Sequence, residues 1–230
     1  MIDGIDGSGK SSVIQAFKEH LAGQGTAIFD LKKYWKEQDR YPELNEFKAY
    51  DFIFSCEPTR VGIGQIIRDE LIKQGNNYPS RAIAEAFSLD RLILYTKIII
   101  PLLKAGKCLI QDRGISTSLA YQPSNKLTLD DIKNLTGNKL ALKYRPDHLI
   151  LLDVDPQQAL QRLKGRTNKN DGAIFEKLNY QKKNAKEFKS KEFQNIFLKQ
   201  KTKIHYLPAG ENIDIMKARA INLFKKLIRE

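Results

Sequence analysis

Residues 4–11 read Gly4-Ile5-Asp6-Gly7-Ser8-Gly9-Lys10-Ser11 and match the pattern G-x-x-x-x-G-K-[ST] at every fixed position. Glycines let backbone N–H groups wrap around phosphate oxygens, and the amino end of a following helix adds a partial positive charge. Apolar residues at helical spacing, from Val13 to Leu21, indicate such a helix directly after the motif. The motif therefore predicts a loop that binds a nucleoside triphosphate. We expect this loop to be formed by Gly4, Ile5, Asp6, Gly7, Ser8, Gly9, Lys10, Ser11 and Ser12.

Two side chains of the motif carry the chemistry expected of such a loop. Lys10 would bridge the β- and γ-phosphates, and the Ser11 hydroxyl would be a ligand of Mg²⁺. We expect Lys10 to be exposed to the phosphates rather than directed into the core. The alternative, a chance glycine-rich turn, is disfavoured by the helix pattern that follows.

Short apolar runs alternate with helical patterns along the rest of the chain, and no internal repeat divides it. Strands are predicted at 27–29, 51–56, 107–111, 148–152 and 204–207, and helices at 63–71, 80–105, 156–163, from 173 and after 212. Strands that alternate with helices favour a parallel sheet covered on both faces. We therefore predict an α/β fold of the P-loop NTPase type, a single domain over 1–230 with about five strands and a mobile lid.

Composition excludes several classes of protein. The chain has 230 residues, a net charge of +12 and 41% hydrophobic residues, which is typical of a globular protein with a substantial core. Only Cys56 and Cys108 are present, so a disulfide scaffold is excluded and a reducing, cytoplasmic location is expected. No segment is apolar enough to span a membrane, and the amino terminus lacks the pattern of a secretory signal.

Two stretches do not fit the regular alternation. Residues 31–50 are polar and rich in aromatic side chains, and we leave open a functional insertion and a surface hairpin or helix. Only Met1 and Ile2 precede the glycine motif, which is short for a central strand. We therefore expect that several residues precede Met1 in the full protein.

A second chemical element, Asp112-Arg113, ends the apolar run 107–111. An acidic residue at the carboxyl end of a buried parallel strand faces the ligand crevice of such a sheet. Asp112 would hold Mg²⁺-bound water there, and Arg113 would clamp a phosphate. The alternative for the isolated dipeptide is a surface ion pair.

Asp112-Arg113 belongs to a series of motifs that resembles the thymidylate kinases. The series consists of Asp6 in the loop, Glu57-Pro58-Thr59-Arg60, Phe87-Ser88-Leu89-Asp90-Arg91, Asp112-Arg113, Ser116 to Gln122, and Leu152 to Pro156 with Arg162. The resemblance runs from Gly4 to about Phe188 and leaves 31–50 unaccounted for. It implies phosphorylation of dTMP to dTDP with ATP and Mg²⁺. Adenylate kinases differ, because they carry proline at the position of Asp6.

The resemblance also implies roles for single residues. Asp6 would contact the acceptor sugar, Phe87 would stack on thymine, Arg91 would reach the base edge and Arg113 would clamp the acceptor phosphate. Glu57 and Arg60 belong to the same acceptor set, and Arg60 would replace the arginine that many bacterial members have at the position of Cys56. Ser118, Tyr121 and Gln122 would line the base and sugar. Gly114 stands where the family usually has an aromatic residue, which alters the pocket wall.

Residues 161–177 resemble the lid of the family. Members with glycine at the position of Gly7 carry catalytic arginines in the lid, and here Arg162 and Arg166 are available. The predicted catalytic residues are therefore Lys10, Asp112, Arg113, Arg162 and Arg166, with Ser11 and Asp112 as metal ligands.

Two other functions stay open on the sequence. A deoxynucleoside kinase would need a carboxylate base, for which Glu57 is available. A nucleic-acid-binding P-loop ATPase is suggested by the net charge and by the lysine-rich stretch 177–203, although aromatic residues suited to base stacking are not interleaved with it. We expect ATP and a nucleoside monophosphate as partners, no nucleic acid and no membrane, and we leave a homodimer open.

Overall fold

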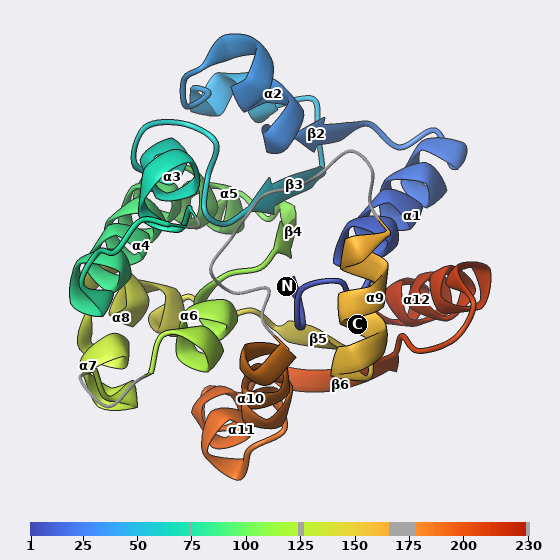
Figure 1. Cartoon of the computed structure of the whole chain (residues 1–230). Coiled ribbons are helices and arrows are strands. Elements are labelled where there is room, and N and C mark those ends of the chain that lie inside the picture. Colours follow the sequence, from blue (N-terminus) through green and yellow to red (C-terminus); the bar gives the residue numbers. More distant parts are fainter. Residues whose placement is uncertain (74, 124–126, 166–177, 229–230) are drawn as a thin grey trace. The chain divides into compact units, whose positions relative to one another are not determined.

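The computed structural model describes residues 1–73, 75–123, 127–165 and 178–228 (Figure 1). The chain divides into two compact units. We call residues 2–26 and 146–230 the loop unit, because they contain the glycine motif, and residues 27–145 with Met1 the central unit. Each unit is described separately below.

The loop unit contains three parallel strands. Strand β5 lies between β1 and β6, with Ile2 opposite Ile150 and Ile150 opposite His205. Helices α1 and α12 lie side by side, where the rings of Phe17 and Phe224 stack with centroids 4.4 Å apart (Figure 1). The elements are β1 (Ile2–Asp3), α1 (Lys10–Gly23), β5 (His148–Asp153), α9 (Pro156–Lys164), α10 (Leu178–Phe188), α11 (Lys191–Leu198), β6 (Lys203–Pro208) and α12 (Ile213–Leu227).

The central unit also contains three parallel strands, with β3 between β2 and β4. Its strands are β2 (Ile28–Asp30), β3 (Phe52–Cys56) and β4 (Cys108–Asp112). Its α-helices are α2 (Leu31–Gln38), α3 (Ile63–Ile66), α4 (Ser80–Leu94), α5 (Ile100–Lys104), α6 (Ile115–Tyr121), α7 (Leu129–Asn134) and α8 (Thr136–Lys143). A 3₁₀ helix spans Leu44–Phe47, and π-helical turns span Ile67–Leu71 and Tyr95–Ile99.

These elements confirm the predicted α/β class with parallel strands. The described residues form six strands rather than about five, because Ile2–Asp3 pairs with β5 although it is only two residues long. Continuous apolar runs such as 148–152 are buried strands because neighbouring backbone groups satisfy their hydrogen bonds while the side chains pack on both faces.

The predicted long helix over 80–105 forms as three consecutive helical segments: α4, the π-helical turn Tyr95–Ile99, and α5. Pro101 explains the change of winding, because it has no N–H and its ring would clash with the carbonyl of Lys97 in a regular α-helix. Helices α7 and α8 were not predicted. The expected helix from 173 is described only from Leu178 onward, since 173–177 lie outside the described residues.

Residues 31–50 form α2 and the 3₁₀ helix rather than a hairpin. Trp35 and Phe47 are fully buried, and the Phe29 and Phe47 rings lie 4.5 Å apart. The segment thus contributes aromatic side chains to the core of the central unit. Among the described residues, no helix combines the length and the apolar composition needed to cross a membrane.

Candidate functional site

The glycine motif forms a tight loop between β1 and α1. Gly4, Gly7 and Gly9 have φ angles of 141°, 81° and 101°, which favour glycine over residues with a side chain. A Cβ atom on Gly4 would lie 2.8 Å from the carbonyl oxygen of Leu152 on β5. The loop therefore depends on glycine both for its backbone conformation and for its close approach to β5.

Lys10 is the first residue of α1, and its ammonium group is directed into the loop. Nζ donates to the carbonyl oxygens of Gly4 at 2.9 Å and Ile5 at 2.7 Å, and it lies 3.4 Å from Ser8 Oγ. Only 7% of the residue is exposed. Lys10 is thus buried within the loop, because the loop carbonyls that surround the ammonium accept its hydrogen bonds, and its contact with phosphates stays a prediction.

Gly7 lies against the first turns of α9. A Cβ atom on Gly7 would clash with the backbone carbonyl of Ala159, which is fully buried. An arginine at this position would require α9 to move. Position 7 of the loop therefore has no room for an arginine side chain in this arrangement of α9.

Arg162 lies in the last turn of α9 and is held by backbone carbonyls. Nη1 donates to Ala209 at 2.7 Å and Nη2 to Glu211 at 3.3 Å. These bonds tie α9 to the segment after β6. Arg166 and most of the predicted lid, residues 166–177, lie outside the described residues.

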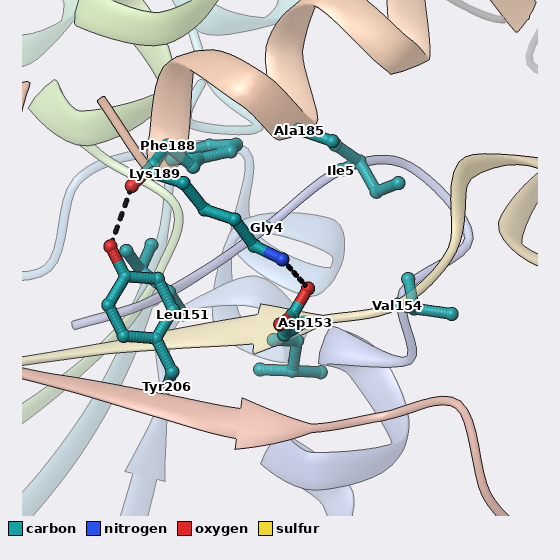
Figure 2. A pocket seen from close by; sticks show the side chains of 10 residues that line it. Gly4, Ile5, Leu151, Asp153, Val154, Ala185, Phe188, Lys189 and Tyr206 are labelled. Carbon is teal, nitrogen blue, oxygen red and sulfur yellow. Dashed lines mark hydrogen bonds and ion pairs between the residues drawn. The ribbon is translucent and has the colours of Figure 1, made fainter.

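A small pocket lies behind the loop and is lined by Gly4 and Ile5, by the end of β5 and by α10 (Figure 2). Lys189 pairs with Asp153 at 2.6 Å on its wall, and the Tyr206 hydroxyl donates to the carbonyl of Phe188 at 2.9 Å. Burial and, to a lesser extent, the carboxylate of Asp6 raise the pKa of Tyr180 on α10 to about 12. The described part of α10 therefore lies close to the loop acid.

In the central unit, β4 ends at Asp112 and Arg113 follows it, so both lie at the carboxyl end of this strand as predicted. Within the described residues, Asp112 Oδ1 is buried and has no hydrogen-bond partner, which suits a ligand of a cation or of its bound water. Arg113 has a φ of 64°, an uncommon conformation for a residue with a side chain. The space beside Gly114, where the sequence analysis noted a missing aromatic residue, is taken by the side chain of Met1.

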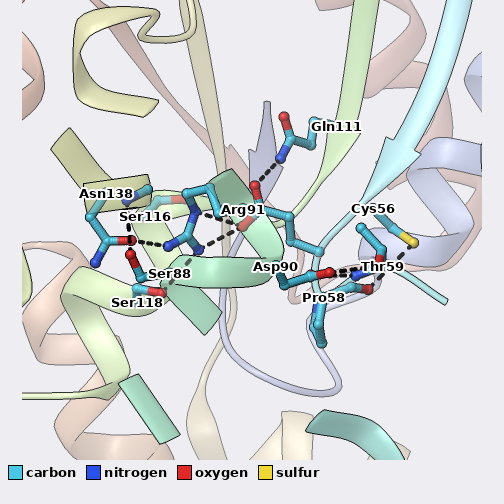
Figure 3. Close-up of polar contacts among 12 residues, drawn as sticks. Cys56, Pro58, Thr59, Ser88, Asp90, Arg91, Gln111, Ser116, Ser118 and Asn138 are labelled. Carbon is cyan, nitrogen blue, oxygen red and sulfur yellow. Dashed lines mark hydrogen bonds and ion pairs between the residues drawn. The ribbon is translucent and has the colours of Figure 1, made fainter. Parts of the chain in front are cut away.

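Arg91 lies at the centre of a buried polar network (Figure 3). Its Nε and Nη2 atoms contact Glu57 Oε2 at 2.8 Å and 2.6 Å, and Nη2 donates to Ser118 Oγ at 3.0 Å. Nη1 donates to Asn138 Oδ1, and Gln111 donates to Glu57 Oε1 at 2.6 Å. Burial raises the pKa of Glu57, and the charge of Arg91 opposes that rise. A charge on the apolar face of α4 needs a partner, and Glu57 provides it for Arg91.

A second buried pair, which no sequence pattern predicted, holds the turn after β3. Asp90 accepts hydrogen bonds from the Thr59 backbone N–H at 2.8 Å and from its hydroxyl at 2.6 Å (Figure 3). Burial raises the pKa of Asp90, and these bonds oppose that rise. Arg68 donates to the carbonyls of Pro58 and Thr59, and Tyr41 Oη lies 3.5 Å from Thr59 Oγ1. In the sequence, only the place of Asp90 within the Phe87–Arg91 motif could have indicated that this carboxylate matters.

The other predicted residues of the central unit are placed as follows. Phe87, Ser118 and Tyr121 are buried, whereas Arg60 and Gln122 are half-buried. Within the described residues, Arg60 Nε and Gln122 Oε1 are buried atoms with no hydrogen-bond partner. Both oxygens of Glu57 are engaged, so the deoxynucleoside kinase alternative, which needs Glu57 as a base, gains no support.

The predicted residues thus fall into two groups. The loop residues from Gly4 to Ser12 and Arg162 belong to the loop unit. The central unit contains the rest of the described set, namely Glu57, Arg60, Phe87, Arg91, Asp112, Arg113, Ser118, Tyr121 and Gln122.

Comparison with known proteins gives a consistent family. The family described as Thymidylate kinase matches residues 42–220. A "Probable thymidylate kinase" of Thermococcus onnurineus is 32% identical over 194 residues, 81% of this chain and 80% of the relative. A second "Probable thymidylate kinase", from Pyrococcus abyssi, is 30% identical over 77% of this chain and 74% of the relative. A "Thymidylate kinase" of Halothermothrix orenii is 29% identical over 76% of this chain and 73% of the relative.

Proposed function

The chain belongs to the thymidylate kinase family, and on that premise we propose that it transfers the γ-phosphoryl group of ATP to dTMP, giving dTDP and ADP. The observation that carries the proposal is the glycine loop with Lys10 at the start of α1. A loop of this geometry can present backbone N–H groups to phosphates, and the helix terminus adds a partial positive charge.

The reaction needs positioning and positive charge rather than covalent help from the protein. An oxygen of the acceptor phosphate attacks the γ-phosphorus, the bond to the β-phosphate oxygen breaks, and ADP leaves. The acceptor phosphate is already ionised near neutral pH, so its attack requires no strong general base. Mg²⁺, when bound, would neutralise charge on the donor phosphates.

We assign the protein's part in the reaction to both groups of residues. In the loop unit, Lys10 would turn from the carbonyls of Gly4 and Ile5 to the phosphates, and Ser11 would hold the cation. In the central unit, Asp112 would orient the cation, for which its buried Oδ1 is suited. The acceptor would be bound by Glu57, Arg60, Phe87, Arg91, Arg113, Ser118, Tyr121 and Gln122, together with Asp6 of the loop.

The lid arginines remain part of the proposal. Because a side chain at Gly7 would clash with Ala159, charge on the moving phosphoryl group must be met by arginines elsewhere. Arg162 and Arg166 are proposed for this role, and Arg162 would first have to leave the carbonyls of Ala209 and Glu211. We further propose that the whole chain acts as one kinase domain with 161–177 as its lid, in the cytoplasm, on nucleotides rather than nucleic acids.

An assay of ADP release with Mg²⁺-ATP and a panel of acceptors tests the function. We expect dTMP to be the best acceptor, and thymidine and ATP alone to give little ADP. Preferred use of thymidine would instead support a deoxynucleoside kinase. ADP release stimulated by DNA or RNA, with steeply salt-dependent binding, would support the nucleic-acid-binding ATPase.

Replacing Arg113 by alanine is expected to raise KM for dTMP by about 10- to 150-fold, with a smaller change in KM for ATP. The reason is the loss of a charge-assisted contact with the acceptor phosphate, worth about 1.5–3 kcal/mol. Steady-state kinetics with each substrate varied in turn measure the effect. Arg219→Ala, which removes an exposed partner of Glu211 in the loop unit, is the control and should leave both constants unchanged. Unchanged acceptor kinetics in Arg113→Ala would disprove the assignment.

A further inference from the structure

Helix α8 makes direct backbone contact with α4, the helix that carries Arg91. The Gly137 N–H donates to Ser88 Oγ at 2.9 Å, and a Cβ atom on Gly137 would clash with the carbonyl oxygen of Ser88. Arg91 follows Ser88 by three residues and therefore lies on the same face of α4. The close crossing brings Asn138, the next residue of α8, to the guanidinium of Arg91.

The side-chain amide of Asn138 is fixed on both sides. It is fully buried, its Nδ2 donates to the carbonyl of Ile132 at 2.7 Å, and its Oδ1 accepts from Arg91 Nη1 (Figure 3). A carbonyl only accepts hydrogen bonds and a guanidinium only donates them, so the amide cannot be turned over without losing both. Asn138 therefore offers Arg91 an acceptor of defined position.

Asn138 contacts the one nitrogen of Arg91 that Glu57 and Ser118 do not reach. Those two residues contact Nε and Nη2, whereas Nη1 donates to Asn138. Nη1 carries two N–H groups, and among the described residues no acceptor contacts the second one. Arg91 is 1% exposed, and this N–H is the one donor of its guanidinium for which the described residues provide no acceptor.

We propose that Asn138 is a positioning residue that fixes Arg91 so that its remaining N–H selects a pyrimidine with an acceptor at position 4 of the ring. This inference rests on the proposed function, in which Arg91 faces the base. Thymine has a carbonyl oxygen at position 4, whereas cytosine has an amino group that donates. A donor held rigidly in place discriminates between these bases, while a donor free to rotate discriminates less well.

Kinetics of four variants with dTMP and dCMP as acceptors test the proposal. Asn138→Leu removes the acceptor at similar volume, and Asn138→Ala removes it without adding volume. Asn138→Asp keeps an acceptor for Arg91. Ser88→Ala removes the bond to Gly137 without touching Arg91 and is the matched control. KM and kcat for each acceptor, KM for ATP and the melting temperature are measured for all of them and for the unaltered protein.

For Asn138→Leu we expect a higher KM for dTMP, an unchanged KM for ATP and a fall of about tenfold or more in the preference for dTMP over dCMP, measured as the ratio of kcat/KM values. Asn138→Asp should keep that preference within about threefold. Ser88→Ala should melt at a lower temperature but keep the preference. This pattern separates a positioning role from a purely structural one.

The proposal is overturned if Asn138→Leu keeps the preference, or if Ser88→Ala loses it equally. It is also overturned if neither apolar variant folds, because Asn138 would then act on folding alone. If the unaltered protein phosphorylates dTMP but Asn138→Leu keeps the preference for dTMP over dCMP, only this inference is refuted. If the unaltered protein phosphorylates no deoxynucleoside monophosphate, the proposed function itself is refuted.

Discussion

Replacing Lys10 by alanine is expected to lower kcat by about a hundredfold or more, to the limit of detection, while the protein stays folded. The proposed transfer depends on positive charge aimed at the phosphates, and loss of one such donor typically costs this much. The ammonium also donates to the carbonyls of Gly4 and Ile5, so the variant should be less stable by about 1–3 kcal/mol. Circular dichroism and thermal unfolding measure the fold, and ADP release measures the transfer.

Lys36→Ala is a suitable control for Lys10→Ala, because Lys36 is an exposed lysine on α2. It should leave both kcat and the melting temperature unchanged. Full activity in Lys10→Ala would contradict the assignment of residues 4–12 as the phosphate-binding loop. Loss of activity together with loss of the folded state would instead show that the contacts with the loop carbonyls are the main role of Lys10.

Replacing Glu57 by glutamine should lower the free energy of unfolding by about 3–5 kcal/mol. The carboxylate lies 2.6 Å from Arg91, and the two side chains are 3% and 1% exposed. Glutamine keeps the shape but leaves the guanidinium charge buried without its counter-ion, and a broken buried ion pair costs about this much. For a chain of this size the melting temperature should fall by about 6–20 °C. Denaturant and thermal unfolding at neutral pH measure the effect.

An exposed pair in the same unit provides the matched control for Glu57. Glu85 accepts from Arg81 at 3.0 Å, with side chains 52% and 67% exposed, so Glu85→Gln should cost no more than about 1 kcal/mol. The double variant Glu57→Gln with Arg91→Met should recover much of the lost stability, because no unpaired charge is then buried. If Glu57→Gln is no less stable than Glu85→Gln, the buried pair does not hold this part of the fold.

Local patterns in the sequence predicted the elements that depend on neighbouring residues. The glycine spacing of residues 4–11 located the loop, and the apolar runs at 51–56, 107–111 and 148–152 located buried strands. The end of the run 107–111 located Asp112 and Arg113 next to each other at the end of a buried strand. These predictions needed only spacing, side-chain polarity and the cost of burial.

Contacts between distant residues were not accessible in the same way. Asp90 binds Thr59 across 31 positions, and Arg91 binds Asn138 across 47. Asn138 lies in a polar stretch whose side chains resemble those of any solvated helix, so its burial depends on the crossing of α8 with α4. The hydrogen bonds of Lys10 to the loop carbonyls were also not predicted, because they follow from carbonyl orientations that the sequence pattern does not specify.

The contact between Gly137 and Ser88 also bears on the exchange of backbone hydrogens with solvent. The Gly137 amide donates to a side chain of α4, so its hydrogen is released only when α8 separates from α4. In a folded protein, segments open as cooperative units with different free energies. The Gly137 amide should therefore exchange at the rate set by detachment of α8, and the rate should rise in Ser88→Ala. Its isotope uptake would report how often Arg91 is left without Asn138.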